Sequence, residues 1–127
     1  MILRMSQLTA LYQVYLKIKD LSFPIKTSYS LAKLGQALEK EIPFYDSEIS
    51  KIINTYGERN DNGNLVQLEN GNVRIQSDKI DECSQKMNEL GELQVEIECS
   101  KIPLESLESI GDISVQELNA LLPIIEV

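Results

Sequence analysis

The sequence predicts a single α+β domain, and three patterns of apolar residues support this prediction. Apolar residues recur at helical spacing over residues 31–56, which predicts one long helix. Two Asn-Gly turns separate short runs of strand-forming residues over 61–76, which predicts a β-hairpin. Apolar and polar residues alternate over 93–100, as in a strand with one buried face. The 127 residues suit one domain, residues 1–127.

An antiparallel helical hairpin is expected at the N-terminal end. The first helix is predicted over about Ser6–Asp20, with a stripe of Leu8, Leu11, Tyr12, Tyr15 and Ile18. Pro24 fits the first turn of the second helix. The second stripe keeps one phase on both sides of Pro43 and comprises Leu31, Leu34, Leu38, Ile42, Tyr45, Ile49, Ile52 and Tyr56. We therefore predict a kink at Pro43 within one helix, a left-handed cap at Gly57, and packing of the whole stripe on the first helix.

A small antiparallel sheet and a third helix are expected next. The hairpin is predicted to turn at Asn70-Gly71, between strands at 65–68 and 73–76. A third helix should begin near Ser77 and end at Gly91. The strand at 93–99 is expected to join the hairpin in a three-stranded sheet, because an isolated hairpin is marginally stable.

The C-terminal segment is predicted to form a short helix. Ser114 and Glu117 have the spacing of a capping box, and Pro123 ends the helical pattern. The pair Ile124-Ile125 should pack on the core or on a partner. No internal repeat is evident from inspection of the sequence.

The composition excludes several classes of function. The chain contains no histidine, so Ser-His and Cys-His nucleophile schemes are excluded, and the commonest metal ligand is missing. No run of about 18 apolar residues suggests a membrane span. The N-terminal segment resembles an amphipathic helix more than a signal peptide, so Cys83 and Cys99 are expected to be reduced thiols.

The net charge of −8 is unevenly distributed. Residues 1–30 carry four basic groups and one acidic group, whereas residues 77–127 carry three basic and twelve acidic groups. The acidic half disfavours binding to nucleic acid. The surface either maintains solubility, which we favour, or complements a basic partner protein.

No catalytic, cofactor-binding or metal site is predicted. The segment Glu58–Glu69 has oxygen-bearing side chains, a glycine and a final glutamate at the spacing of an EF-hand calcium loop. Its first position is Glu instead of Asp, its third and fifth positions are the neutral Asn60 and Asn62, and no helix follows, so turns explain it better. Carboxylate pairs such as Glu96/Glu98 fall on the predicted solvent face and do not suggest two-carboxylate catalysis.

Two aromatic residues are candidates for contact with a partner. Tyr29 and Phe44 fall opposite the main stripe of the second helix, among Lys33, Lys40 and Lys51. Exposed aromatic side chains beside basic groups are typical anchors of protein interfaces. Alternatively, another part of the fold covers this second face.

The sequence resembles a group of small, uncharacterised proteins encoded by bacteriophages and prophages. The resemblance covers nearly the whole chain and lies in the segments PIKTSYSLAKL, EIPFYDSEISKIINTYGERNDNGN, ENGNVRI, MNELGELQVEIE and ISVQELNALLPIIE. The phage proteins often end in an apolar-aromatic pair, where this chain has Ile124-Ile125. The resemblance implies a phage protein in the host bacterial cytoplasm or on the virion, with no established activity and no catalytic residues.

Three functional hypotheses follow. The leading one is a non-enzymatic phage accessory protein that acts by protein-protein interaction, in virion assembly or as a structural adaptor, through self-association or a protein partner. The second is an acidic inhibitor of a host defence or nucleic-acid-processing protein. A small carboxylate hydrolase is the least favoured. No cofactor, nucleic acid or membrane is expected to take part.

Overall fold

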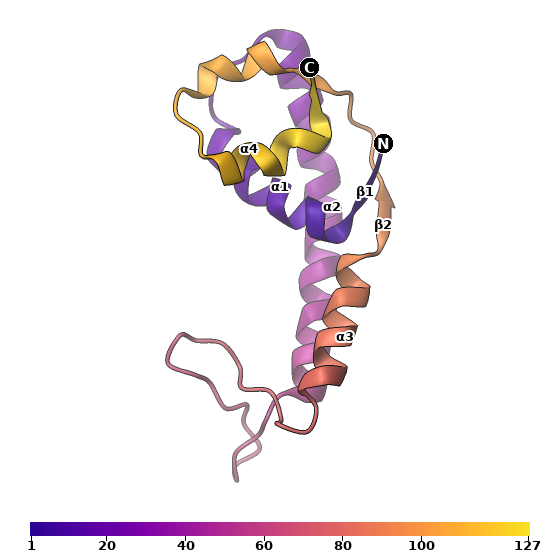
Figure 1. The fold of residues 1–127 in the computed structure, drawn as a ribbon, viewed down its shortest axis with the longest axis vertical. Helices are drawn as coiled ribbons and strands as arrows, with labels where there is room; N and C mark the ends of the chain where they lie inside the picture. Colours follow the sequence, from indigo (N-terminus) through magenta and orange to yellow (C-terminus); the bar gives the residue numbers. More distant parts are fainter. The chain divides into compact units, whose positions relative to one another are not determined.

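The computed structural model describes residues 1–127 and confirms an α+β fold, with an antiparallel helical pair and two small sheets (Figure 1). The elements are β1 (Ile2–Arg4), α1 (Met5–Ile18), α2 (Ile25–Tyr56), α3 (Ile80–Gly91), β2 (Gln94–Glu96), β3 (Ile102–Pro103), the 3₁₀ helix η1 (Leu104–Ile110), α4 (Val115–Leu121), the 3₁₀ helix η2 (Leu122–Ile124) and β4 (Ile125–Glu126). No helix combines the length and apolar character needed to cross a membrane.

The chain divides into two compact units, which share helix α2. The terminal unit comprises Met1–Ile42 and Gln94–Val127, and the central unit comprises Pro43–Leu93. Helix α2 is continuous through Pro43, where the second unit begins.

The terminal unit contains nearly all of the buried core. One face of α1 supplies Met5, Leu8, Leu11, Val14 and Ile18, and the first part of α2 supplies Leu31, Leu34, Leu38 and Ile42. The C-terminal pair Ile124-Ile125 is also buried, which confirms that it packs on the core. Sixteen of the eighteen buried apolar side chains belong to this unit.

Strand pairing in the terminal unit differs from the prediction. Strand β2 pairs antiparallel with the N-terminal strand β1, in the register Ile2↔Glu96, and does not join the hairpin. Both sides of the hairpin instead form backbone bridges with residues 57–59, so neither side is open to β2. A second pair, β3 and β4, is parallel, in the register Ile102↔Ile125.

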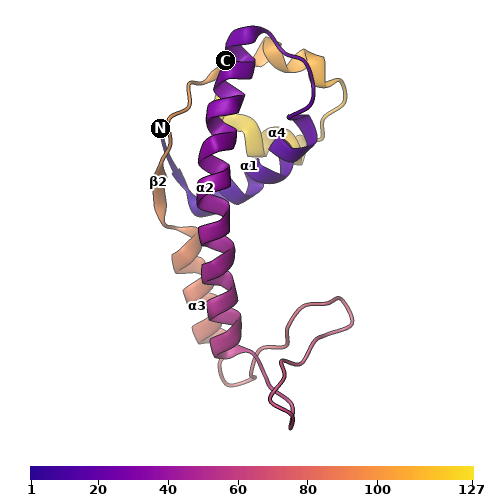
Figure 2. The same ribbon diagram turned by 180° about the vertical axis from the view of Figure 1, so that it is seen from behind.

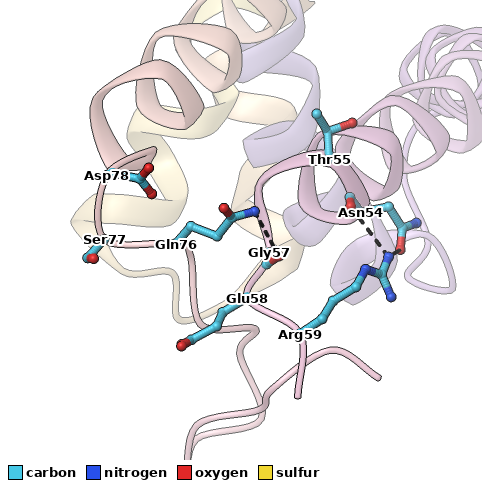
Figure 3. A pocket seen from close by; sticks show the side chains of 8 residues that line it. All are labelled: Asn54, Thr55, Gly57, Glu58, Arg59, Gln76, Ser77 and Asp78. Atoms are coloured by element: carbon cyan, nitrogen blue, oxygen red, sulfur yellow. Dashed lines mark hydrogen bonds between the residues drawn. The ribbon is translucent and has the colours of Figure 1, made fainter. Parts of the chain in front are cut away.

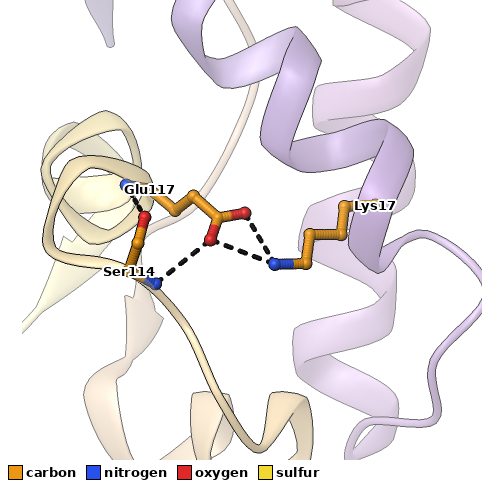
Figure 4. Close-up of polar contacts among 3 residues, drawn as sticks. All are labelled: Lys17, Ser114 and Glu117. Atoms are coloured by element: carbon orange, nitrogen blue, oxygen red, sulfur yellow. Dashed lines mark hydrogen bonds and ion pairs between the residues drawn. The ribbon is translucent and has the colours of Figure 1, made fainter.

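The predicted capping box is confirmed at the start of α4 (Figure 4). The Glu117 N–H donates to Ser114 Oγ at 3.0 Å, and the Ser114 N–H donates to Glu117 Oε1 at 3.1 Å. Lys17 of α1 adds a bond that the sequence did not predict, since its Nζ lies 2.8 Å from Glu117 Oε2. One carboxylate therefore both caps α4 and ties it to α1.

The Glu117 carboxylate makes acid stability testable. The hydrogen bond from Lys17, followed by those from Ser114, lowers the pKa of Glu117 below its usual 4.5. A carboxyl group with a lowered folded-state pKa stabilises the fold above its unfolded pKa, and this stability is lost as pH falls through the folded pKa. We expect Glu117→Gln to lower the melting temperature at neutral pH and to have no effect in strong acid.

Thermal melts at several pH values measure this effect. Glutamine can still close a capping box, so the variant isolates the charge. Lys17→Met should give the same pH dependence, because it removes the partner of the same ion pair. A melting-temperature difference that is unchanged from neutral to acidic pH would assign the contribution to packing instead of charge.

The central unit consists of the end of α2, the helix α3 and a connecting segment. Both views show α3 beside the C-terminal part of α2 and running in the opposite direction (Figures 1 and 2). The predicted stripe continues here, but Tyr45, Ile49, Ile52 and Tyr56 are only partly buried. The expectation that the whole stripe packs on α1 is therefore wrong, because beyond Pro43 the neighbouring helix is α3.

The connecting segment contains an internal repeat of eight residues, contrary to the sequence analysis. Its three octads are 57–64 (GERNDNGN), 65–72 (LVQLENGN) and 73–80 (VRIQSDKI). The N–H of Glu58 donates to the carbonyl of Arg74, that of Arg74 to Val66, and that of Val66 back to Glu58, over 2.7–2.9 Å. Each octad thus pairs with both others, and we call this arrangement the octad ring.

A second set of bonds follows the same period. The N–H groups of residues 60, 68 and 76 donate to the carbonyl groups of residues 64, 72 and 56, over 2.7–3.0 Å. The turns also repeat, because the N–H groups of residues 63, 71 and 79 each donate to the carbonyl three residues earlier, at 2.9 Å. The three octads are therefore joined by backbone hydrogen bonds without forming a regular sheet.

Glycine positions explain the turns and correct the prediction for Gly57. Gly63 and Gly71 have φ of +82° and +86°, while the preceding asparagines have negative φ. These values fit three-residue hairpin turns that end in a left-handed residue, and the second turn lies at the predicted Asn70-Gly71. Gly57 ends α2 but is not left-handed, so the predicted left-handed cap is wrong there.

Candidate functional site

The main candidate site is a hollow of about 840 Å³ in the terminal unit, which we call the Tyr29 groove. It lies between the first turns of α2 and the segment that contains β3. Its lining comprises Pro24, Ile25, Lys26, Thr27, Tyr29, Ser30, Ser100, Lys101, Ile102, Pro103, Ser106 and Glu126. Segments far apart in the sequence therefore form its two sides.

The polar side chains at the base of the groove already have partners. Thr27 is only 2% exposed, and its Oγ1 donates to Ser106 Oγ at 2.9 Å. Ile102 beside it is 1% exposed. No buried side-chain nitrogen or oxygen atom in the chain lacks a hydrogen-bond partner. The base of the groove therefore does not require a polar ligand.

Two apolar side chains of the groove lining are largely exposed. Ile25 is 85% exposed and Tyr29 is 65% exposed, although both belong to a regular helix. Burying such side chains against a partner contributes about 25 cal/mol per Å² of apolar surface. The groove is therefore suited to an apolar side chain from another molecule.

Tyr29 also borders a second hollow, of about 310 Å³, on the side of β2. This hollow includes Met1, Lys33 and the segment 96–100. Cys99 is partly buried there, its Sγ lies 3.6 Å from the carbonyl oxygen of Ser30, and burial raises its pKa. The thiol is therefore protonated near neutral pH and is not an activated nucleophile.

Two lysines line the groove and a third lies over Tyr29, and none of them has a carboxylate partner. The Lys33 ammonium lies 5.7 Å from the centroid of the Tyr29 ring, which is a cation-π distance. Lys26 and Lys101 line the groove, and none of the three has a carboxylate within 4.0 Å. Glu126 is the one acidic residue of the lining. In a chain of net charge −8, this local excess of positive charge favours an acidic ligand.

The structure separates the two aromatic residues singled out in the sequence. Tyr29 lies in the terminal unit and lines the groove, whereas Phe44 lies in the central unit, is 47% exposed and lines none of the hollows described. Sequence reasoning missed Ile25 and the segment 100–103. Ile25 falls outside the buried stripe of α2, which is the signal that could have indicated it.

A polar hollow of about 460 Å³ lies beside the end of α2 in the central unit (Figure 3). Two of its side chains are hydrogen-bonded within the chain. Gln76 Nε2 donates to the Gly57 carbonyl at 3.4 Å, and Arg59 Nη2 donates to the Asn54 carbonyl at 3.4 Å. Glu58 is paired with Arg74 at 3.3 Å. These contacts stabilise the junction between helix and ring.

The predicted calcium-like segment, Glu58–Glu69, forms the first turn of the octad ring and leads into the second. Asn60 Oδ1 accepts the N–H groups of Asn62 and Asn64 at 2.9 and 3.1 Å, and Arg59 Nη1 donates to the Gly63 carbonyl at 2.9 Å. The Asn60 side chain, one of the candidate ligands, therefore stabilises the turn, as the turn interpretation expects. No three His, Cys, Asp or Glu side chains in the chain are grouped to hold a metal ion.

Comparison with known proteins gives no match to a family model, a curated protein or a solved structure.

Proposed function

We propose that this chain is a non-enzymatic accessory protein that acts by protein-protein interaction, with the Tyr29 groove as a docking surface. The observation that carries the proposal is the pair Ile25 and Tyr29, which are 85% and 65% exposed beside a hollow whose polar base is already hydrogen-bonded. Exposed apolar side chains grouped at a concave surface are typical of interaction sites.

The partner proposed for this groove is a peptide segment with an apolar anchor and acidic neighbours. The apolar side chain would pack between Ile25 and Tyr29. Its carboxylates would meet Lys26 and Lys101, whose ammonium groups have no partner within the chain. Such rim charges affect specificity and association rate more than affinity, so the apolar contact should dominate binding.

The resemblance to bacteriophage proteins suggests a context for this activity. We favour a role in virion assembly or as a structural adaptor. A second candidate is inhibition of a host defence or nucleic-acid-processing protein, which the twelve acidic groups among residues 77–127 favour, because such host proteins are often basic. Binding that requires the Tyr29 groove supports the first role, and binding that requires only the acidic surface supports the second.

A peptide array tests the groove directly. We expect peptides with an apolar residue flanked by Asp or Glu to bind the full chain better than the same peptides with Lys or Arg. Tyr29→Ala should weaken this binding about tenfold or more, the effect typical of an aromatic anchor. The melting temperature should change little, because Tyr29 is 65% exposed.

Phe44→Ala is the matched control, since it removes an exposed aromatic side chain from the same helix but outside the groove. We expect it to leave peptide binding unchanged. Equal loss of binding in both variants would assign the contact to the wider face predicted from the sequence. Preference for basic peptides, or full binding by Tyr29→Ala, would contradict the proposal.

A further inference from the structure

We propose that the central unit carries a separate docking groove for a basic, amphipathic segment of a partner protein. This α3 groove has a volume of about 610 Å³ and lies between the octad ring and helix α3. Its lining comprises Leu68, Val73, Arg74, Ile75, Ser77, Ile80, Cys83, Ser84, Met87 and Asn88. All of these residues belong to the central unit, so the inference is independent of the Tyr29 groove.

The apolar side chains of the α3 groove are displayed by both of its walls. Ile80, Cys83 and Met87 are spaced three and four residues apart and therefore share one face of α3. Ile80 is 51% exposed, and Leu68, on the ring side, is 46% exposed. An apolar face at this spacing is the feature that binds an amphipathic helix in a groove.

The central unit does not complete its own apolar core. Of its apolar side chains only Cys83 and Leu90 are fully buried, against sixteen in the terminal unit. Two short helices with a small ring are too small to surround a core, so their apolar faces remain partly in water. A partner segment laid in the α3 groove would cover Ile80 and Leu68.

The charges of the central unit indicate which charge the partner segment should carry. The central unit contains ten acidic and five basic residues. Glu69 and Asp81 directly follow the lining residues Leu68 and Ile80, and neither has a basic partner within 4.0 Å. The one cation of the lining, Arg74, is already paired with Glu58 at 3.3 Å. The excess of acidic groups in the unit that carries this apolar groove favours Lys or Arg side chains in the partner.

The same charges disfavour a second copy of this chain as the occupant. Two central units in contact would bring together two surfaces that each carry twice as many acidic as basic groups. Such like charges repel, and the repulsion is relieved by salt. Binding of a basic partner weakens as salt rises, whereas self-association strengthens. A salt titration therefore distinguishes the two occupants.

Two synthetic helical peptides provide the test. Both carry leucines at i, i+3, i+4 and i+7; one has lysines at its other positions and its pair has glutamates. We expect the lysine peptide to bind the full chain in a fluorescence anisotropy titration, with an affinity that falls as salt rises. The glutamate peptide should bind only through the Tyr29 groove, so the Tyr29→Ala variant should bind the lysine peptide and not the glutamate peptide.

Variants locate the binding site. Ile80→Ser should weaken lysine-peptide binding about tenfold or more, and Asp81→Asn should weaken it less and flatten its salt dependence. Leu68→Ser, in the ring wall, checks the groove independently if Ile80→Ser alters the fold, as judged by circular dichroism. Tyr29→Ala, in the other groove, should leave the affinity unchanged.

Three outcomes would overturn the inference. They are equal binding of both peptides by the Tyr29→Ala variant, unchanged lysine-peptide binding by both Ile80→Ser and Leu68→Ser, and a dimer in light scattering that strengthens with salt and is lost in Ile80→Ser. The last outcome would assign the groove to a second copy. Failure of the Tyr29 groove in the peptide array would leave this result unaffected.

Discussion

Replacing Leu34 with alanine is expected to lower the free energy of unfolding by about 2–5 kcal/mol. Leu34 lies on α2 in the core of the terminal unit and is 0% exposed. The substitution removes its buried methyl groups and leaves a cavity that the neighbouring side chains fill only in part. Because domains of this size have total stabilities of about 5–15 kcal/mol, the variant should lose a large fraction of its stability.

Urea denaturation followed by circular dichroism measures this loss. Ile25→Ala is the matched control, because Ile25 lies on the same helix but is 85% exposed. Its effect should stay within about 0.5 kcal/mol. Equal effects of the two substitutions would mean that the first part of α2 does not pack into the terminal core.

Replacing Gly57 with valine is expected to disrupt the octad ring. A Cβ atom at this position would lie 2.6 Å from the Ile53 carbonyl oxygen, 2.6 Å from Leu65 Cδ2 and 3.0 Å from Val73 Cγ1. The backbone oxygen cannot rotate away, so the ring or the end of α2 must move. Such overpacking costs about 1–3 kcal/mol, and the small central unit has few other contacts to offset it.

Amide hydrogen exchange shows where this damage falls. We expect the N–H groups of Glu58, Val66 and Arg74 to lose protection together, because each donates to the carbonyl of the next around the ring. Gly63→Asn is the control, since a Cβ there meets nothing within 4 Å and asparagine tolerates the left-handed geometry. Loss of protection at Glu58 alone would show that the ring is not cooperative.

The helices could be predicted because their signals are local. The periodic leucines of residues 31–38 determine which face of α2 is buried, and Ser114 with Glu117 marks the start of α4 by its own hydrogen bonds. The partner of each face was harder to predict. The stripe beyond Pro43 has the same spacing as the part before it, yet the neighbouring helix there is α3, because packing partners depend on chain topology.

Sheet pairing could not be derived from the sequence for the same reason. The alternation of residues 93–100 shows that a strand has two unlike faces, but it does not identify the neighbour that donates its hydrogen bonds. Strand β1 has three residues and no distinctive pattern, so nothing marked it as the partner of β2. The Tyr29 groove depends on such long-range placement, and only its exposed tyrosine could be anticipated.

The repeat is difficult to recognise in the sequence, because its backbone hydrogen bonds recur more regularly than its side chains. The positions equivalent to Gly57 are Leu65 and Val73, and the glycine of the first two turns is Lys79 in the third, where the chain enters α3. Only the Asn-Gly-Asn triplets recur clearly, in two of the three octads. The two triplets, at residues 62–64 and 70–72, are one octad apart, and this distance is the sequence signal of the repeat.

The closed hydrogen bonding of the octad ring limits how this segment can change in length. An open sheet can gain or lose a strand at its edge, because the remaining strands keep their partners. In the ring, each octad donates to one neighbour and accepts from the other, so a missing octad would leave two neighbours unmatched. Length variation among natural variants of this segment is therefore expected at the turn tips near Asn62 and Asn70, and not through loss of whole octads.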